Sequence, residues 1–285
     1  MKFSFMYEYR QTFHITRMAK VLQVSESGYY KWLQRRNAPE TAKDLSDRQL
    51  IGEIERLFRE SRGSYGIRKI TASLRDSQLV NHKRVERLMK KRGLFSRTCH
   101  QYIVTTDSDH DEPVAENLLN RDFHAERPNE KMVSDTTVIL TSQGKLYVAA
   151  ILDLYGRIPV GMAMGRTNDR FLVMDALNDM KARGCGKEGC IIHSDRGSTY
   201  ASKDYRQLLE TYGLVCSMSR KGDCWDNAPM ESFWGKLKSE WLKPRYKRLD
   251  EAVMDVYEYV WDFYPCRRPH ASLGYATPKE IYNSK

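Results

Sequence analysis

Apolar and polar positions alternate with a helical period through the first part of the chain. From Ile15 to Leu22 the apolar residues recur at i, i+3, i+4 and i+7, which predicts a helix with one buried face. Ser25 follows a break in this pattern and can cap a second helix that contains Tyr29 and Trp32. Two short helices joined by a tight turn are typical of a helix-turn-helix, and a plain helical hairpin explains this segment equally well.

A second helical stretch continues the pattern with more charge. Apolar residues from Leu50 to Phe58 predict one helix, the segment SRGSYG predicts a turn, and two further helices follow. Basic residues outnumber acidic ones by 13 to 5 over residues 51–100, which favours a phosphate-contacting surface over an ordinary solvated face. We therefore predict helix-turn-helix-like modules over residues 1–45 and 46–97. The candidate DNA-contacting residues of the second module are Arg68, Lys69, Lys83 and Arg84.

The hydrophobic period changes after a polar, acidic stretch that contains TTDSDHDEP. We predict a linker over residues 98–127 and a core over residues 128–285. Within the core, β-rich runs separated by turn residues predict three consecutive antiparallel strands. Shorter strands and helices then alternate, and the order βββαβαβα predicts a mixed sheet with helices on its faces. The expected strands are 132–140, 145–154, 158–164, 190–193 and 214–218, and the expected helices are 169–183, 203–212 and one from about Pro229.

The formal net charge of +10 is unevenly distributed along the chain. Residues 1–100 carry 22 Lys and Arg against 10 Asp and Glu, whereas residues 101–285 carry 25 against 27. This difference predicts a polyanion-binding region joined to a nearly neutral part with another task. Because 41% of the residues are hydrophobic and no window approaches 18 uninterrupted apolar residues, the composition excludes a disordered chain and a membrane-spanning one.

The first residues and the cysteines indicate the compartment. The N-terminal segment alternates charged and aromatic residues where a signal peptide would be apolar, which predicts a cytoplasmic protein. Six cysteines without paired Cys-x-x-Cys spacing are typical of reduced thiols. Cys185, Cys190 and His193 are conceivable zinc ligands, but no fourth ligand is evident, and a glycine-rich turn before a buried strand is the favoured interpretation.

Three carboxylates stand at the positions where chemistry is expected. Asp135 lies inside the first strand of the core, Asp195 ends the strand IIHS, and Glu231 begins the long helix after a loop of turn formers. Each acid alone is more often a cap or a surface group. Brought together, they would repel one another unless a cation lay between them, and hard oxygen ligands suit Mg²⁺ or Mn²⁺. Two such ions about 4 Å apart can activate a water or a 3′-hydroxyl for phosphoryl transfer.

Helix geometry places Glu231 at the rim of the core. The apolar residues of this helix, from Met230 to Trp241, cluster on one face that must pack on the sheet. Glu231 and Lys238 then share a second line, about 90° from that face, so the Lys238 amine can meet a phosphate. Other candidate DNA-contacting residues near the core are Arg220, Lys221, Lys236 and the basic cluster KPRYKR at 243–248.

Several blocks of this chain resemble one known family. These blocks are SRGSYGIRKITASLR, NHKRVERLMKKRGL, NLLNRDFHAERPNEKMVSDTT, GKLYVAAILDLYGRIPVGMAM, HSDRGSTYAS, SMSRKGDCWDNAPMESFWGKLKSE and RRPHASLGYATP. They are similar to transposases of the insertion sequence 3 group, specifically the second-frame product with its retroviral-integrase-like core. Between Asp135 and Asp195 lie 59 residues, and between Asp195 and Glu231 lie 35, which is the spacing the family calls D,D(35)E.

The resemblance implies both a fold and a reaction. The expected fold is a ribonuclease-H-like mixed sheet preceded by helical modules, with two Mg²⁺ (or Mn²⁺) ions bound by Asp135, Asp195 and Glu231. Lys238 matches a basic residue commonly found seven positions after the Glu. The implied reaction is hydrolysis at the ends of the element to free a 3′-hydroxyl, followed by attack of that hydroxyl on another phosphodiester. The usual route passes through a single-strand-joined intermediate and an excised circle.

The resemblance also implies partners and leaves alternatives. The expected partners are double-stranded DNA at the terminal inverted repeats and at the target, further copies of the chain, and an upstream first-frame product or frameshift fusion. The sequence departs from the family at Met132, where Trp is usual, and at Pro265, where Asn is usual. A DNA-binding regulator with an unused core and a nuclease that never transfers strands are the competing interpretations. His193 and His270 are expected to serve packing at a strand end and in the closing loop.

Overall fold

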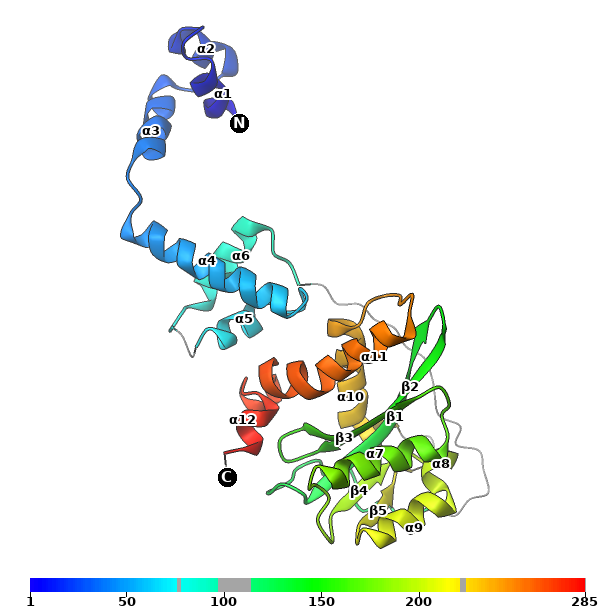
Figure 1. Ribbon diagram of the computed structural model, residues 1–285. Coiled ribbons are helices and arrows are strands. Elements are labelled where there is room, and N and C mark those ends of the chain that lie inside the picture. The colour runs from blue at the N-terminus through cyan, green and yellow to red at the C-terminus, as the bar shows by residue number, and fades with distance from the viewer. Residues whose placement is uncertain (76–77, 97–113, 221–223, 285) are drawn as a thin grey trace. The chain divides into compact units, whose positions relative to one another are not determined.

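The computed structural model describes residues 1–75, 78–96, 114–220 and 224–284, which form two compact units, Met1–Glu53 and Ile54–Lys285 (Figure 1). The first unit contains α1 (Lys2–Glu8), α2 (Ile15–Leu22), α3 (Glu26–Asn37) and the start of α4 (Ala42–Glu60). The Ser25 side chain caps α3 by accepting a hydrogen bond from the Gly28 amide at 3.1 Å, as predicted. The sequence pattern did not reveal α1, although its Met6 is fully buried against α2 and α3.

The second unit begins with the end of α4, followed by α5 (Ile67–Ser73) and α6 (His82–Arg92). Ile70 and Val85 are fully buried in this helical segment. The Asn81 side chain caps α6, and Gly93 ends it in the left-handed conformation with φ of 67°. A glycine adopts that conformation without the steric cost that a Cβ imposes. The predicted three-helix stretch is therefore confirmed.

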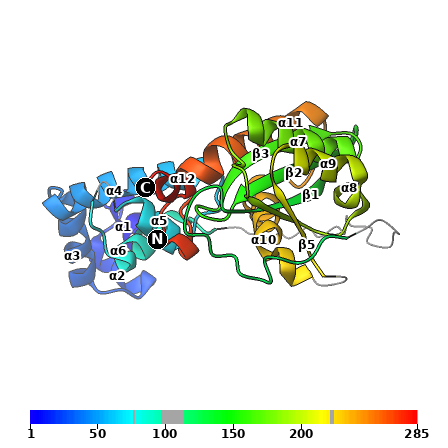
Figure 2. The same cartoon turned by 90° about the horizontal axis from the view of Figure 1, so that it is seen from below.

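A five-stranded mixed sheet follows in the chain order that the sequence predicted. Its strands are β1 (Lys131–Thr141), β2 (Gly144–Asp153), β3 (Ile158–Gly165), β4 (Ile191–Ser194) and β5 (Val215–Met218). Their spatial order is β3-β2-β1-β4-β5, with β1 antiparallel to β2 and parallel to β4 (Figure 1). Figure 2 shows β3, β2 and β1 side by side. The helices α7 (Arg170–Ala182), α8 (Ser198–Ala201) and α9 (Lys203–Thr211) lie next to one another and share one apolar core with the sheet.

The other face of the sheet supports the carboxyl-terminal helices. Met132 belongs to the core beneath α7, and side chains alternate between the faces along a strand, so Asp135 points to the opposite face. That face is covered by α10 (Ala228–Lys236) and α11 (Leu249–Glu258), which both contact β1. The remaining elements are 3₁₀ turns at Cys224–Asn227 and Ala271–Leu273, π-helical turns at Leu237–Trp241 and Tyr259–Arg267, and α12 (Pro278–Tyr282).

Two features of these helices refine the sequence prediction. The long helix expected from Pro229 is α-helical only to Lys236 and continues as the π-helical turn that contains Lys238. Pro265 lies inside the second π-helical turn, where its missing amide donor and its ring disfavour a regular α-helical bond. Among the helices that the structure describes, none has the length and apolar character needed to span a bilayer.

Candidate active site

The register of two parallel strands brings the first two acids together. Val133 of β1 pairs with His193 of β4. Continuing this register by two residues places Asp135 beside Asp195, which directly follows the last residue of β4. Adjacent strands lie about 4.8 Å apart, so the two carboxylates are carried by neighbouring strands at the same level of the sheet. The Gly197 amide donates to Asp195 Oδ1 at 3.0 Å and orients that carboxylate.

Helix α10 brings the third acid to the same place. Glu231 is exposed in the first turn of α10, which contacts β1. The Trp234 indole Nε1 donates to Asp135 Oδ2 at 3.1 Å, and Asn227 Nδ2 donates to the Ser134 carbonyl at 3.1 Å. These two bonds fix the start of α10 to the part of β1 that carries Asp135. The predicted apolar face of the helix is buried, and it consists of Met230, Phe233, Trp234, Leu237 and Trp241.

The electrostatics agree with a convergent site. Burial raises the pKa of Asp135 well above its usual value, and the charges of Asp195 and Glu231 raise it further, while bonds from the Thr136 amide and Trp234 act in the opposite direction. Burial also raises the pKa of Glu231. Burial lowers the pKa of Lys238, and the nearby charge of Asp135 opposes that shift. The carboxylate of Asp135 therefore interacts electrostatically with Asp195, Glu231 and Lys238, and a cation beside it would relieve the repulsion among the acids.

The donor chemistry of this centre suits a hard divalent cation. Three carboxylates offer only oxygen ligands, which Mg²⁺ and Mn²⁺ prefer. Within the described part of the chain, no three Asp, Glu, His or Cys side chains already stand in a metal-ligating arrangement. A cation beside Asp135 would also offset the burial and the neighbouring charges that raise the pKa of this carboxyl group.

The buried His193 has a structural role. Its Nδ1 lies 2.8 Å from Ser217 Oγ and its Nε2 lies 3.1 Å from Ser219 Oγ, so both ring nitrogens have partners. Burial lowers the pKa of His193 to about 4. The imidazole therefore joins the ends of β4 and β5, in agreement with the expected packing role. Cys185 and Cys190 are free thiols, and the zinc interpretation has no support among the described residues.

A buried carboxylate that the sequence did not single out anchors the loop before α10. Asp226 is fully buried, and its carboxylate accepts hydrogen bonds from the side chains of Arg121 at 2.9 Å and Asn117 at 2.9 Å. Arg220 also donates to it, from Nη2 at 2.8 Å. The bond from Arg220 is the largest cause that holds the pKa of Asp226 far below its usual value. The Arg220 guanidinium, a candidate for DNA contact, is thus bound within the loop, and Lys221 lies outside the described residues.

Replacing Asp226 with Asn is expected to destabilise the protein by about 2 kcal/mol, because two guanidinium groups lose a charged partner. The melting temperature of the metal-free protein measures this loss. The matched control is Asp250→Asn, since Asp250 is exposed and its ion pair is with Arg248 at the surface. Equal melting temperatures for the two variants would contradict the anchoring role of Asp226.

The other predicted DNA-contacting residues fall into two groups. Lys69 and Lys236 line one cavity beside α10 together with Arg68. Lys83 and Arg84 lie on α6, outside that cavity. His270 is buried with its ring centroid 4.7 Å from that of Tyr264, which agrees with its expected packing role. The assignment of these residues to DNA contact stays a prediction.

The five-stranded mixed sheet with helices on both faces is the topology expected of an integrase-type core, and sequence comparisons agree. Family models described as integrase core domain match residues 125–224 and 212–278, and a model described as HTH-like domain matches residues 45–102. The 31 kDa protein of insertion element IS600 from Shigella sonnei is 41% identical over 263 residues, 92% of this chain and 96% of that protein. Transposase InsF for insertion sequence IS3A from Escherichia coli is 33% identical over 285 residues, 99% of both chains.

The chain therefore belongs to the IS3 transposase family, and it has the ribonuclease-H-like core that the resemblance implied. Solved structures with a similar chain trace include the HTLV-2 integrase catalytic core domain in complex with magnesium. That comparison has a TM-score of 0.43 at 14% identity and covers 56% of this chain and 100% of the other. A chain of the simian T-cell lymphotropic virus intasome gives a TM-score of 0.48 at 13% identity, covering 72% of this chain and 68% of the other.

Proposed function

We propose that this protein is a DNA transposase that cuts DNA at the ends of an insertion sequence and joins the freed 3′-hydroxyls to a second phosphodiester. The observation that carries the proposal is geometric: the strand register sets Asp135 beside Asp195, and the Trp234 bond ties to Asp135 the helix α10, whose first turn contains Glu231. Membership of the IS3 transposase family supports the same reaction class. A regulator would need no such site, because its work is complete once DNA is bound.

The chain's own residues divide the work. Asp135, Asp195 and Glu231 would hold two Mg²⁺ or Mn²⁺ ions through their oxygens. When bound, such ions activate the attacking water or hydroxyl and stabilise the leaving oxygen of an in-line displacement. Trp234 and Gly197 fix the orientation of two of these carboxylates through the bonds at 3.1 Å and 3.0 Å. Lys238, beside Asp135, is placed to hold a DNA phosphate near the acids.

The partners follow from this reaction. The substrates are double-stranded DNA at the terminal inverted repeats and at the target site, held by the helical modules predicted at residues 1–45 and 46–97. Candidate contacts there include Lys83 and Arg84. Two element ends must meet during joining, so we propose that several copies of the chain assemble on DNA in the bacterial cytoplasm, alone or with an upstream first-frame product.

The test is a strand-joining assay with labelled duplexes taken from both edges of the insertion sequence. Wild-type protein is expected to join ends only when Mg²⁺ or Mn²⁺ is present, and Glu231→Gln is expected to lose the activity. The control variant is Glu210→Gln, which changes an exposed glutamate of α9 and should keep wild-type activity. Joining by Glu231→Gln at the wild-type rate would refute the proposed site. Cutting without any joining would instead support the nuclease interpretation.

A further inference from the structure

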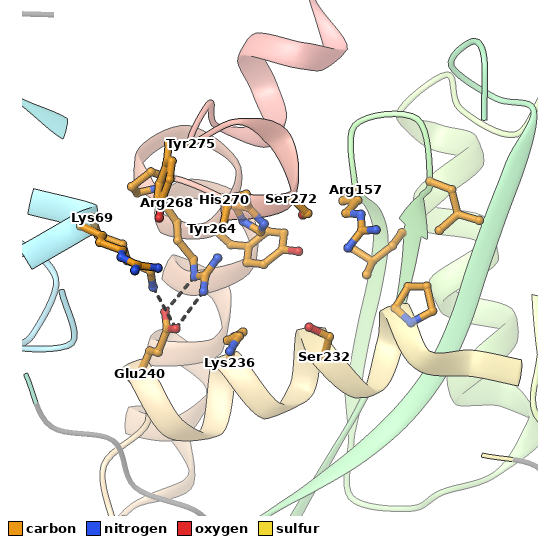
Figure 3. A pocket seen from close by; sticks show the side chains of 16 residues that line it. Lys69, Arg157, Ser232, Lys236, Glu240, Tyr264, Arg268, His270, Ser272 and Tyr275 are labelled. Carbon is orange, nitrogen blue, oxygen red and sulfur yellow. Dashed lines mark hydrogen bonds and ion pairs between the residues drawn. The ribbon is translucent and has the colours of Figure 1, made fainter. Parts of the chain in front are cut away.

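A cavity of about 350 Å³ lies beside the helix that carries Glu231 (Figure 3). Four segments of the second unit meet around it: α5, the turn between β2 and β3, α10 with its π-helical extension, and the closing segment 268–275. Neither Asp135, Asp195 nor Glu231 lines it, although Ser232 on the next position of α10 does. The cavity is therefore a neighbour of the acidic site and is lined by different side chains.

The lining of this cavity is strongly positive. It contains five cationic side chains, those of Arg68, Lys69, Arg157, Lys236 and Arg268, and one carboxylate, that of Glu240. Glu240 is already engaged, because Lys69 Nζ donates to it at 3.0 Å and Arg268 Nη2 at 2.8 Å. Figure 3 shows these bonds at one end of the cavity, with Arg157 at the other end.

Three cations remain without a protein partner. Within the described ranges, no hydrogen bond or ion pair involves the cationic side chain of Arg68, Arg157 or Lys236. Arg157 moreover holds a left-handed backbone with φ of 53°, which is uncommon for a residue with a Cβ. Three unpaired cations around one concave surface repel one another, and an anion at the centre would remove that repulsion.

A buried polar atom supplies an independent sign of a missing ligand. His270 is only 7% exposed, lines the cavity, and its Nε2 has no hydrogen-bond partner among the described residues. Leaving such an atom buried and unpaired is unfavourable, because it has lost its hydrogen bonds to water without replacing them. Burial, followed by the charges of Arg268 and Lys69, lowers the pKa of His270 to about 3, so the ring is neutral at pH 7. A neutral imidazole that carries its hydrogen on Nε2 can donate to an anion's oxygen.

We propose that this cavity binds a backbone phosphate of the DNA on which the enzyme acts. Arginine, lysine and serine side chains are the usual donors to DNA phosphates, and Ser232 and Ser272 add hydroxyls to the cations. The cavity has the volume of roughly ten water molecules, which accommodates a phosphate with part of its sugar but not a duplex. The ligand is therefore a single phosphate of a DNA strand that runs across the opening of the cavity.

The position of the cavity suggests how a phosphate contact there would position the DNA strand. Arg68 and Lys69 come from the helical segment that matches an HTH-like domain, whereas Ser232 and Lys236 come from the helix that carries Glu231. A phosphate held between them fixes the register of the strand relative to the acids. The identity of the ligand as DNA rests on the proposed function, whereas the preference for an anion rests on the cavity alone.

The experiment measures binding of the full chain to a labelled duplex of mixed sequence at several salt concentrations. The variants are Arg157→Gln and Lys236→Gln, with Arg127→Gln and Lys187→Gln as controls at exposed cations outside the cavity. Each cavity variant is expected to bind roughly tenfold more weakly and to lower the slope of log K against log salt by about 1, as for one lost phosphate contact. The controls should match wild type in affinity and slope, and none of the four variants should melt below wild type, because removal of a cation from the cavity relieves repulsion.

Other results would overturn the proposal in distinguishable ways. If both cavity variants bound DNA with the affinity and salt slope of wild type, the cavity would not bind a DNA phosphate. That result would not bear on the proposed strand-joining activity. Stabilisation of wild type, but not of the cavity variants, by inorganic phosphate, together with unchanged DNA binding, would assign the cavity to a free anion. Failure of the wild-type protein to bind any duplex would overturn both this proposal and the proposed function. Wild-type DNA binding through the cavity without joining would support the cavity and refute the transposase.

Discussion

The variant Asp135→Asn is expected to lose strand joining by about 10³-fold or more and, in the absence of metal, to be more stable than wild type. The loss follows because removal of one ligand charge forfeits several kcal/mol of transition-state stabilisation, and each 1.36 kcal/mol is tenfold in rate. The gain in stability follows because burial, Asp195 and Glu231 all disfavour the ionised form of Asp135 and raise its pKa. Asparagine keeps the shape of the side chain without the charge.

Melting curves with and without Mg²⁺ measure the second half of this prediction. Without metal, Asp135→Asn should melt roughly 2–4 °C higher, the equivalent of about 1 kcal/mol for a domain of this size. Adding Mg²⁺ should stabilise wild type and have little effect on the variant, because a ligand stabilises only the state that binds it. The control is Asp175→Asn at an exposed position of α7. A variant that melts below wild type in both conditions would contradict the repulsion among the acids.

The variant Glu240→Gln is expected to lose about 3 kcal/mol of stability, a fall in melting temperature on the order of 10 °C. The Glu240 carboxylate accepts bonds from Lys69 at 3.0 Å and from Arg268 Nε at 2.8 Å. Its side chain is 7% exposed, and that of Arg268 is 5% exposed. Glutamine would leave the buried Arg268 and the partly buried Lys69 without this counter-charge. The matched control is Glu188→Gln, an exposed glutamate whose loss should leave the melting temperature unchanged.

The contribution of Glu240 to stability is expected to depend on pH. The bonds and charges of Arg268 and Lys69 outweigh the effect of burial and lower the pKa of Glu240 from 4.5 to about 2. Burial and Arg268 lower the pKa of Lys69 even though Glu240 acts to raise it, so the stabilisation is assigned to the carboxylate. A carboxylate whose pKa is lowered by folding stabilises the folded protein fully at pH values above its pKa in the unfolded chain. That stabilisation is lost as the pH falls from 4.5 to about 2 and the carboxylate is protonated. As the pH falls over that interval, the difference in free energy of unfolding between wild type and Glu240→Gln should therefore become smaller.

The sequence predicted the sheet because each strand has a local signature. The runs that became β1, β2 and β3 are rich in β-formers and end in turn residues, and Ser25 lies where a side chain caps a helix. The three acids were predicted because Asp135 lies inside a strand, where an unpaired charge is costly, because Asp195 and Glu231 lie at the ends of elements, and because the motifs around them resemble one family. These signals depend on residues that are near one another in sequence or on a familiar spacing.

The remaining contacts join residues that are far apart in sequence and have no local signature. Lys69 and Glu240 are 171 residues apart, and Arg121 and Asp226 are 105 residues apart. Nothing in either neighbourhood distinguishes these side chains from solvated surface charges. For the same reason Lys69 and Arg220 were predicted only as DNA contacts, whereas each binds a buried carboxylate. The π-helical turn at Lys238 likewise depends on packing rather than on the helical period.

The most direct test of the account is whether the three acids act as one centre. The measurement is the rate of joining of labelled element ends by Asp135→Asn, Asp195→Asn and Glu231→Gln, each alone and in pairs, in the presence of Mg²⁺. Groups that act as a unit are strongly non-additive, so each single variant should lose nearly all of the activity and each pair should lose little more. Any single variant that joins ends at the wild-type rate, or pairs whose losses multiply, would contradict a shared acidic site.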